Sequence, residues 1–317
     1  MSETNSSNSP ARVLVTGGAS FIGAPTVARL LSAGHAVTVL DNLSNSERNI
    51  LPTHERMQFI EGDIRDPVAL AAATDGVDCV LHLAGQVSVA VSIATPIPSA
   101  DVNVLGFLAV LEAVRAKRIK RLVYASSAAV YANSLQAITE SAATEPSSPY
   151  GMEKLINDEY AKLYANLHGL SIVGLRYFNV YGACQQASEY AGVLTQFTQR
   201  IHQAKPLLVY GDGTQSRDFI HVSDVAELNC RAIFSDAVGV LNVATGRSVS
   251  LNEIIATLAE ITGVLPTVQY LPARSGDIQH SLAIVDRLRQ TLGPIADVGL
   301  QQGLAQLLRQ LKRPCQT

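Results

Sequence analysis

The strongest constraint on the fold is a short β-branched run that leads directly into a glycine-rich turn. Residues Arg12–Thr16 read RVLVT, residues 17–23 follow as GGASFIG, and a helical pattern covers 22–32. Glycines in such a turn let the main chain approach a phosphate, and the helix N-terminus offers free N–H groups. Gly34 then ends the helix, as glycine commonly does. These residues predict a strand–turn–helix unit that binds a dinucleotide.

The same alternation of apolar strands and helices continues through the first half of the chain. Strands that are apolar throughout and alternate with helices are typical of a parallel sheet covered on both faces. The sequence therefore predicts the α/β class, with a Rossmann-type doubly wound parallel sheet over residues 11–178 that binds the dinucleotide. The predicted further strands are 36–40, Met57–Glu61, 79–83, 121–126 and 171–176, and the predicted helices are Pro67–Ala73, 98–117 and Pro149–His168.

The order of elements loosens after Asn179. Helical patterns there alternate with short strands such as 240–243 and 267–271. We expect a smaller C-terminal α/β lobe over 179–317 that binds the substrate, with segments near 215–245 returning to the main sheet. The helices expected in this part are 191–204, 223–234, Leu251–Thr262 and 300–311.

Composition and charge narrow the class of function. Hydrophobic residues make up 47% of the 317 residues and the net charge is −3, so a large core is available and a basic surface is not. We therefore expect no nucleic-acid or membrane partner. Residues 1–10 are polar and should be disordered, no apolar run of membrane-spanning length is apparent, and a cytoplasmic location is expected. The four widely spaced cysteines, Cys79, Cys184, Cys230 and Cys315, indicate free thiols and no metal site.

A tyrosine and a lysine four residues apart stand at the start of the helix predicted at 149. Ser148 is a suitable N-cap, Pro149 suits the first helical position, and Tyr150 and Lys154 share one face. An ammonium beside a phenol should lower the pKa of the phenol, and a phenolate can remove a proton from an alcohol. The spacing alone fits a surface pair equally well, so the surrounding residues decide.

Two residues give further detail on the predicted dinucleotide site: one indicates which cofactor binds, and the other departs from the usual glycine pattern. Asp41 ends the second predicted strand, where it can accept hydrogen bonds from an adenosine ribose and would repel a 2′-phosphate, which favours NAD over NADP. Ser20 replaces the second close-approach glycine in the pattern Gly17-x-x-Ser20-x-x-Gly23. Two consequences stay open: the turn is slightly displaced, or the Ser20 hydroxyl hydrogen-bonds a phosphate.

Ordered motifs along nearly the whole chain resemble the extended short-chain dehydrogenase/reductase superfamily, in its nucleotide-sugar epimerase/dehydratase branch. The resemblance is closest to the 4-epimerases of UDP-glucose and UDP-N-acetylglucosamine. The motifs are TGGASFIG over 16–23, DNLSNS over 41–46, GDI over 62–64, HLAG over 82–85, YASSAAVY over 124–131, YGMEK over 150–154, RYFNVYG over 176–182, GDG over 211–213, RDFIHV over 217–222 and RSGD over 274–277.

The resemblance implies tightly bound NAD, a UDP-sugar substrate and no metal. The implied catalytic residues are Ser127, Tyr150 and Lys154. The implied cofactor-binding residues are Gly17, Ser20, Phe21, Ile22, Gly23, Asp41, Asn42, Asn45, Ser46, Asp63, Ile64, Leu83, Ala84, Gly85, Asn103, Ser126, Tyr150, Lys154 and Tyr177. The implied substrate-binding residues are Gln86, Ser127, Asn179, Val193, Tyr210, Arg217, Arg274, Asp277 and Ser281.

Ala128 and Ala129 reduce the number of reactions that are expected of this chain. The 4,6-dehydratases of this branch carry an Asp-Glu pair directly after the catalytic Ser or Thr, and alanine cannot do acid–base work. The expected reaction is therefore 4-epimerisation of a UDP-hexose through a transient 4-keto sugar, with Tyr150 as the base. The alternatives are a nucleotide-sugar dehydratase or epimerase of other regiochemistry, and a non-catalytic NAD-binding sensor.

Ser281 bears on the size of the sugar. Its aligned position holds a tyrosine that narrows the sugar pocket in strict UDP-galactose epimerases, so a serine predicts comparable turnover of UDP-GlcNAc and UDP-Glc. Ala132 and the unusual GACQQ loop over 182–186 lie near the sugar side and leave another nucleotide sugar open. The family commonly dimerises through the helices at 98–117 and Pro149–His168, which implies a homodimer.

Overall fold

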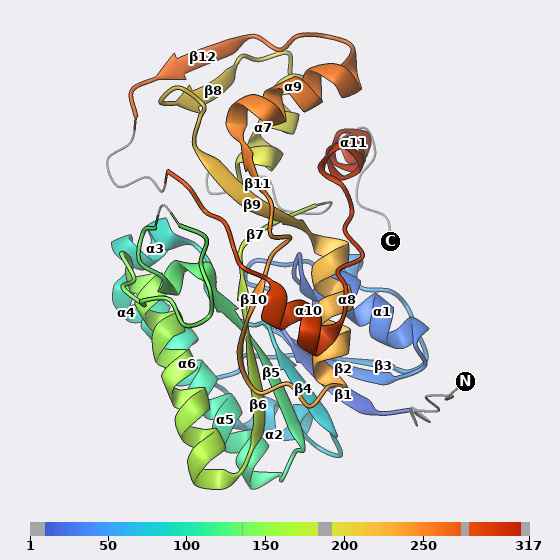
Figure 1. Ribbon diagram of the computed structural model, residues 1–317. Coiled ribbons are helices and arrows are strands. Elements are labelled where there is room, and N and C mark those ends of the chain that lie inside the picture. The colour runs from blue at the N-terminus through green and yellow to red at the C-terminus, as the bar shows by residue number, and fades with distance from the viewer. Residues whose placement is uncertain (1–9, 135, 183–191, 274–278, 312–317) are drawn as a thin grey trace, which may run out of the picture.

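The computed structural model describes residues 10–134, 136–182, 192–273 and 279–311, which form one large parallel sheet and a smaller lobe above it (Figure 1). The sheet is parallel throughout, and its strand order is β10-β6-β5-β4-β1-β2-β3. This confirms the predicted α/β doubly wound class. The strands are β1 (Arg12–Thr16), β2 (Ala36–Asp41), β3 (Met57–Glu61), β4 (Cys79–His82), β5 (Arg121–Ser127), β6 (Ser171–Tyr177) and β10 (Gly239–Val243).

Helices cover both faces of this sheet because successive strand residues point to opposite faces. In β1, Val13 and Val15 join one apolar cluster, whereas Leu14 joins the other. The first cluster is covered by α1 (Gly23–Ser32), α8 (Val222–Ile233) and α10 (Asp286–Leu292), and the second by α2 (Pro67–Ala73), α5 (Gly106–Ala116) and α6 (Pro149–His168). Figure 1 shows α5 and α6 to the left of the sheet and α1 and α8 to its right.

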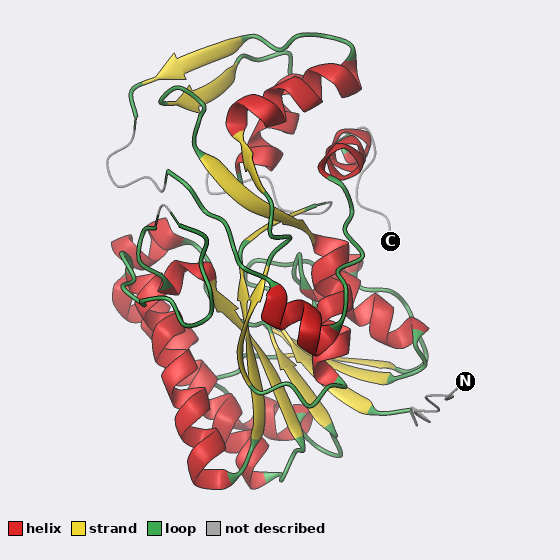
Figure 2. Cartoon of the chain, in the orientation of Figure 1, coloured by secondary structure: helices red, strands yellow, loops and turns green. Residues whose placement is uncertain are grey.

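The smaller lobe has an apolar core of its own, which includes Leu194, Phe197 and Ile254. Figure 2 shows its short strands and helices gathered at one end of the main sheet. One small sheet has the order β11-β9-β7 and the other pairs β12 with β8. The elements are β7 (Asn179–Tyr181), α7 (Val193–His202), β8 (Leu207–Tyr210), β9 (Ser216–His221), β11 (Ser248–Ser250), α9 (Leu251–Thr262), β12 (Val268–Leu271) and α11 (Leu300–Gln310).

The helix predicted at 98–117 is present, but it begins at Pro96 and contains a π-helical turn, and a separate short helix precedes it. The elements are α3 (Val89–Ala94), α4 (Pro96–Ala100), the π-helical turn η2 (Asp101–Leu105) and then α5. Helix α4 begins at Pro96 because proline lacks an N–H and is suited to the first helical position. Short 3₁₀ turns, η1 (Arg48–Ile50) and η3 (Ala128–Val130), complete this part of the chain.

The continuous helix Pro96–Ala116 also corrects the expectation that no segment has membrane-spanning length. It covers 21 residues with mean hydropathy 1.5, which meets the length and composition of a span. This is weak evidence for a span, because core helices of globular proteins meet the same criteria. Here Phe107, Val110 and Leu111 of the helix are fully buried in the apolar cluster under α2 and α6.

Candidate active site

A cavity of about 190 Å³ lies at the carboxyl ends of β1, β2 and β4. Parallel α/β sheets bind ligands at this edge, where strands give way to loops and helix N-termini. Twelve of the sequence-predicted residues line it, one of which, Gln86, was predicted as a substrate contact. They are Gly17, Ser20, Asp41, Asn42, Asn45, Ser46, Asp63, Ile64, Leu83, Ala84, Gly85 and Gln86.

The glycine turn leaves no room for side chains at two positions. Gly17 has φ +69°, and a Cβ there would lie 2.6 Å from the main-chain nitrogen of Ala84. A Cβ on Gly23 would lie 2.4 Å from the carbonyl oxygen of Gly17. The turn can therefore pack against the end of β4 only with glycine at both positions.

Ser20 closes the turn internally, which is neither of the two roles left open by the sequence. Its hydroxyl donates to the carbonyl oxygen of Gly17 at 2.6 Å and accepts from the main-chain N–H of Gly23 at 3.2 Å. The serine thus satisfies one of the free N–H groups at the start of α1, as an N-cap side chain does.

Asp41 fixes the floor of the cavity from the end of β2. It is buried, and its carboxylate accepts from the Ala19 N–H, the Leu43 N–H and the Ser46 hydroxyl, each at 2.9 Å. The carboxylate therefore ties the glycine turn to the loop after β2. A carboxylate has about four acceptor positions, so three protein donors leave capacity for a further one.

Asp63 supplies a second fixed carboxylate at this rim. It accepts from Asn42 at 2.9 Å and pairs with Arg65 at 2.7 Å. The hydrogen bond from the Arg65 guanidinium holds the pKa of Asp63 well below its usual range. Asp63 therefore stays ionised in an ion pair with Arg65.

The three predicted catalytic side chains converge beside this cavity. Ser148 caps α6 by accepting from the Gly151 N–H at 3.1 Å, which places Tyr150 and Lys154 on its first turns as predicted. The Ser127 side chain, at the end of β5, lies close enough to the Tyr150 phenol to favour its ionised form. Lys154 donates to the Ala125 carbonyl oxygen at 3.0 Å, and a Cβ on Gly85 would lie 3.7 Å from its ammonium.

The expectation that the pKa of the Tyr150 phenol is lowered is wrong in its net direction. Burial raises the pKa of Tyr150 above its ordinary value, and the nearby Ser127 side chain only partly opposes this. The ammonium lies 5.9 Å from the centre of the phenol ring, where it is held by Ala125. Burial also lowers the pKa of Lys154 to about 8, because desolvation disfavours its charged form.

The other predicted cofactor residues named next lie outside the lining of this cavity. Phe21, Ile22 and Gly23 form the turn into α1 without lining the cavity. Tyr177 donates to Asn229 of α8 at 2.7 Å, so its hydroxyl serves packing between β6 and α8. Asn103, in η2, is 2% exposed, and its amide is engaged with Gln86 and Glu153.

The predicted substrate residues lie mainly where the smaller lobe meets the sheet. Asn179 of β7 donates to the Asp218 carbonyl oxygen at 3.1 Å, and Arg217 of β9 donates to the Ser216 carbonyl oxygen at 3.0 Å. The Ser281 N–H donates to that same oxygen of Ser216 at 3.0 Å. Val193 begins α7 and Tyr210 ends β8, whereas Arg274 and Asp277 lie outside the described residues.

Sequence reasoning missed a buried carboxylate within the catalytic motif. Glu153 lies between Tyr150 and Lys154 in α6, is 4% exposed, and accepts from Ser99 and Asn103. The available signal was a glutamate on the helix face otherwise used for packing.

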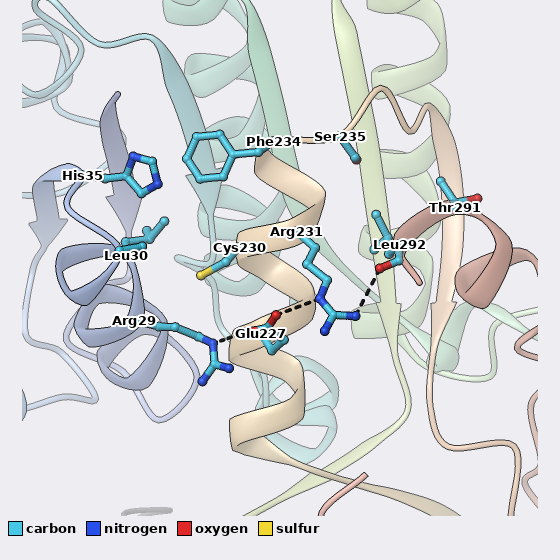
Figure 3. Close-up of a pocket in the computed structure, with 11 residues that line it drawn as sticks. Arg29, Leu30, His35, Glu227, Cys230, Arg231, Phe234, Ser235, Thr291 and Leu292 are labelled. Atoms are coloured by element: carbon cyan, nitrogen blue, oxygen red, sulfur yellow. Dashed lines mark hydrogen bonds and ion pairs between the residues drawn. The ribbon is translucent and has the colours of Figure 1, made fainter. Parts of the chain in front are cut away.

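A larger cavity of about 490 Å³ lies at the opposite edge of the sheet, between the C-terminal ends of α1, α8 and α10 (Figure 3). Figure 3 shows Glu227 between Arg29 and Arg231, with which it pairs on both sides. Arg231 also donates to the Leu292 carbonyl oxygen at 3.2 Å. Its charged groups are thus paired with one another.

Comparison with known proteins identifies the family. Residues 13–244 match the model of the NAD dependent epimerase/dehydratase family. The chain belongs to this family. The UDP-glucose 4-epimerase of Corynebacterium glutamicum is 33% identical over 297 residues, which cover 89% of this chain and 90% of that protein.

Two solved structures agree with this chain over almost their whole length. UDP-N-acetylglucosamine 4-epimerase from Methanobrevibacter ruminantium M1, in complex with UDP-N-acetylmuramic acid, is 34% identical with a TM-score of 0.93, covering 96% of this chain and 99% of that one. The UDP-glucose 4-epimerase of Thermus thermophilus, in complex with NAD, is 35% identical with a TM-score of 0.87, covering 96% of this chain and 100% of that one.

The site fits the cofactor of the NAD dependent epimerase/dehydratase family. The close-packed glycine turn leaves the main chain accessible, as a pyrophosphate requires. The Ser126 hydroxyl oxygen at the end of β5 is buried and has no hydrogen-bond partner among the described residues. Buried polar atoms are nearly always satisfied, so this orphan atom fits a site completed by a ligand. The buried carboxylate of Asp41, at the end of β2, favours NAD over NADP at the adenosine end.

Proposed function

We propose that this protein is an NAD-dependent 4-epimerase of a UDP-hexose. The observation that carries the proposal is the convergence of Ser127, Tyr150 and Lys154 from β5 and α6 beside the dinucleotide cavity. The relatives named above support the reaction class, because they include epimerases that act at C4 of UDP-sugars.

In the proposed reaction, Tyr150 removes the proton of the sugar C4 hydroxyl and later returns it. Ser127 lies close to the phenol and is placed to hand a proton to the reacting oxygen. Bound NAD supplies the acceptor for the C4 hydride, and its positive charge favours ionisation of a nearby phenol. Lys154 donates to the Ala125 carbonyl oxygen, and its ammonium lies near Gly85 in the cavity wall. From this position it can also donate to a cofactor ribose.

The residues after Ser127 favour epimerisation over dehydration. Ala128 and Ala129 form the turn η3, and the Ala129 N–H donates to the Ser127 hydroxyl oxygen at 3.1 Å. Neither side chain can move a proton at C5 or C6. A 4-keto sugar formed here has one outcome open to it, which is to receive the hydride on its other face.

The proposed diphosphate contacts come from the smaller lobe. Arg217 of β9 lies next to the Gln279 carbonyl, to which its guanidinium also donates at 3.4 Å, and Asn179 lies on the neighbouring strand. A guanidinium binds a diphosphate through two parallel hydrogen bonds. Together with Arg274 and Asp277, these residues form the UDP-sugar site that we propose.

A direct test combines cofactor release with NMR of the sugar. Purified protein is denatured and the released nucleotide is identified, and then native protein is incubated with UDP-Glc or UDP-GlcNAc and the C4 configuration is followed. The proposal expects NAD and conversion to the galacto form. A dehydrated 4-keto product, or inertness of the native protein toward a nucleotide-sugar panel, would contradict it.

Ser281 is the proposed determinant of sugar size. It is 8% exposed and its main chain is fixed to Ser216. Comparable turnover is expected for UDP-GlcNAc and UDP-Glc, and Ser281→Tyr should remove the first activity while keeping the second. Rejection of UDP-GlcNAc by the native protein would refute this role.

We also propose a homodimer through the helices around α6. Several apolar side chains there are exposed in the single chain: Ile93, Ile97, Leu105, Met152, Leu163 and Leu167. Exposed apolar patches of this kind commonly mark protein interfaces. Light scattering should give twice the chain mass, and Leu163→Glu with Leu167→Glu should give the monomer.

A cytoplasmic location remains part of the proposal. Cys79 and Cys230 are free thiols, as a reducing compartment maintains them.

A further inference from the structure

Glu153 is a buried carboxylate without a cationic partner in the part of the chain that the structure describes. One oxygen accepts from the Ser99 hydroxyl at 2.9 Å and from the Asn103 amide at 2.6 Å. The other oxygen is buried without a hydrogen-bond partner. Burying an unpaired carboxylate costs desolvation free energy. A glutamate at this position next to Lys154 therefore indicates a role that offsets this cost.

One effect of Glu153 is mechanical and passes through Asn103. The Asn103 amide both accepts from the Gln86 N–H and donates to the Gln86 carbonyl, each at 2.8 Å. Gln86 also donates to Ser99 at 3.1 Å. Residues 84–86 line the cofactor cavity, so the carboxylate on α6 holds that wall by way of η2 and α4.

The close packing at Gly85 makes this wall sensitive to Asn103. A Cβ on Gly85 would lie 2.9 Å from the Asn103 amide oxygen and 3.7 Å from the Lys154 ammonium. The Asn103 amide oxygen and the Lys154 ammonium thus both lie close to Gly85 in the cavity wall.

The other effect of Glu153 is electrostatic. Lys154 is buried, and the carboxylates that raise its pKa are Asp158 and Glu153, both on α6. Asp158 is already paired with Arg176 of β6 at 2.8 Å. His82 of β4 is neutral because burial lowers its pKa to about 3. Asp158 has the larger effect of the two carboxylates, and Glu153 is the one that has no ion pair among the described residues.

We propose that Glu153 is a positioning residue: its carboxylate clamps Asn103 and the 84–86 wall of the cofactor cavity, and its charge keeps Lys154 protonated. The inference rests on the proposed function for the role of Lys154, but its test does not require turnover.

The test measures the titration of Lys154 directly. Protein labelled with ¹³C at the lysine side chain is titrated by NMR, and the Lys154 signal is identified by its absence in Lys154→Arg. The chain has six lysines: Lys117, Lys120, Lys154, Lys162, Lys205 and Lys312.

Glu153→Gln removes the charge and keeps the shape. The Lys154 midpoint, near 8 in the native protein, should fall by about 1 pH unit. Glu159→Gln is the matched control, because Glu159 is an exposed residue of the same helix, and the midpoint should stay in place. An unchanged midpoint in Glu153→Gln overturns the electrostatic part.

Glu153→Asp keeps the charge but shortens the reach to Asn103. The Lys154 midpoint should stay near that of the native protein, while NAD released on denaturation falls several-fold. If Glu153→Gln does not fold, Glu153→Asp alone tests both parts of the proposal. Full retention of NAD in Glu153→Asp overturns the clamp. A lowered Lys154 titration midpoint in Glu153→Asp overturns the electrostatic role. Absence of turnover in native protein would reject the proposed function without changing either readout.

Discussion

The two cavities at opposite edges of the sheet differ in the kind of residue that lines them. In the larger one, Glu227 pairs with both Arg29 and Arg231, and the His35 ring accepts from the Ala11 N–H at 3.2 Å and stacks on Phe234. The smaller one is lined by the glycine turn and by the carboxylates of Asp41 and Asp63, and the catalytic candidates converge beside it. The difference teaches that the kind of residue lining a cavity marks the candidate site better than its volume does.

The largest effect should come from Tyr150→Phe at the carboxyl edge. Removing the phenolic oxygen removes the proposed acid–base group, which typically contributes about 10³-fold to the rate. We expect turnover of UDP-Glc to fall by about that factor while released NAD stays at the native level. Tyr164→Phe removes a hydroxyl from a half-buried position further along the same helix, where it donates to Glu112, and should keep native turnover. Undiminished turnover in Tyr150→Phe would break the assignment of chemistry to this edge.

Gly23→Ala should weaken the cofactor site itself. The added methyl would meet the Gly17 carbonyl oxygen at 2.4 Å, and overpacking of this kind costs about 1–3 kcal/mol. NAD affinity, measured by calorimetry on cofactor-free protein, should fall about tenfold to hundredfold. Gly299→Ala is the control, because a methyl there meets nothing within 4 Å. Equal affinities for the two variants would show that the turn does not hold the dinucleotide.

The pH dependence of turnover should show the ionisation of Lys154. Burial lowers its pKa to about 8, so the side chain is charged below that pH and neutral above it. Turnover should therefore decline as the pH rises through about 8. In Lys154→Arg the guanidinium stays charged to above pH 12, so whatever activity remains should lack this alkaline decline. The same decline in both enzymes would assign it to another group.

The smallest effect should come from Arg29→Ala in the larger cavity. Its ion pair with Glu227 is partly exposed, and such pairs contribute at most about 1 kcal/mol. Urea denaturation should show a loss of that size or less, with native NAD content and turnover. A loss of NAD would mean that the two edges of the sheet are coupled.

Much of the fold could be predicted from local patterns. Buried runs such as Val13–Leu14–Val15 mark the strands, and Ser148 and Pro149 mark the start of α6, because these signals lie within a few residues. Helix α10 was missed because it buries only Leu288 and Leu292, too few apolar residues to give a clear period.

The candidate site was predictable as a set of residues but not as a network. Tyr150, Lys154 and Ser127 converge as their motifs predict. The Glu153–Asn103–Gln86 clamp was missed because its members lie on three segments that meet only after packing. The direction of the Tyr150 pKa also depends on burial, which helix spacing does not report.

The position of β10 at the end of the main sheet has a consequence for synthesis of the chain. β10 pairs with β6, yet residues 178–238 separate them and include β7, α7, β8 and β9 of the smaller lobe. On the ribosome, β6 keeps an open edge until residue 243 has emerged, and an open strand edge is where chains pair wrongly. The nascent chain must therefore release about half of its smaller lobe before the main sheet is complete.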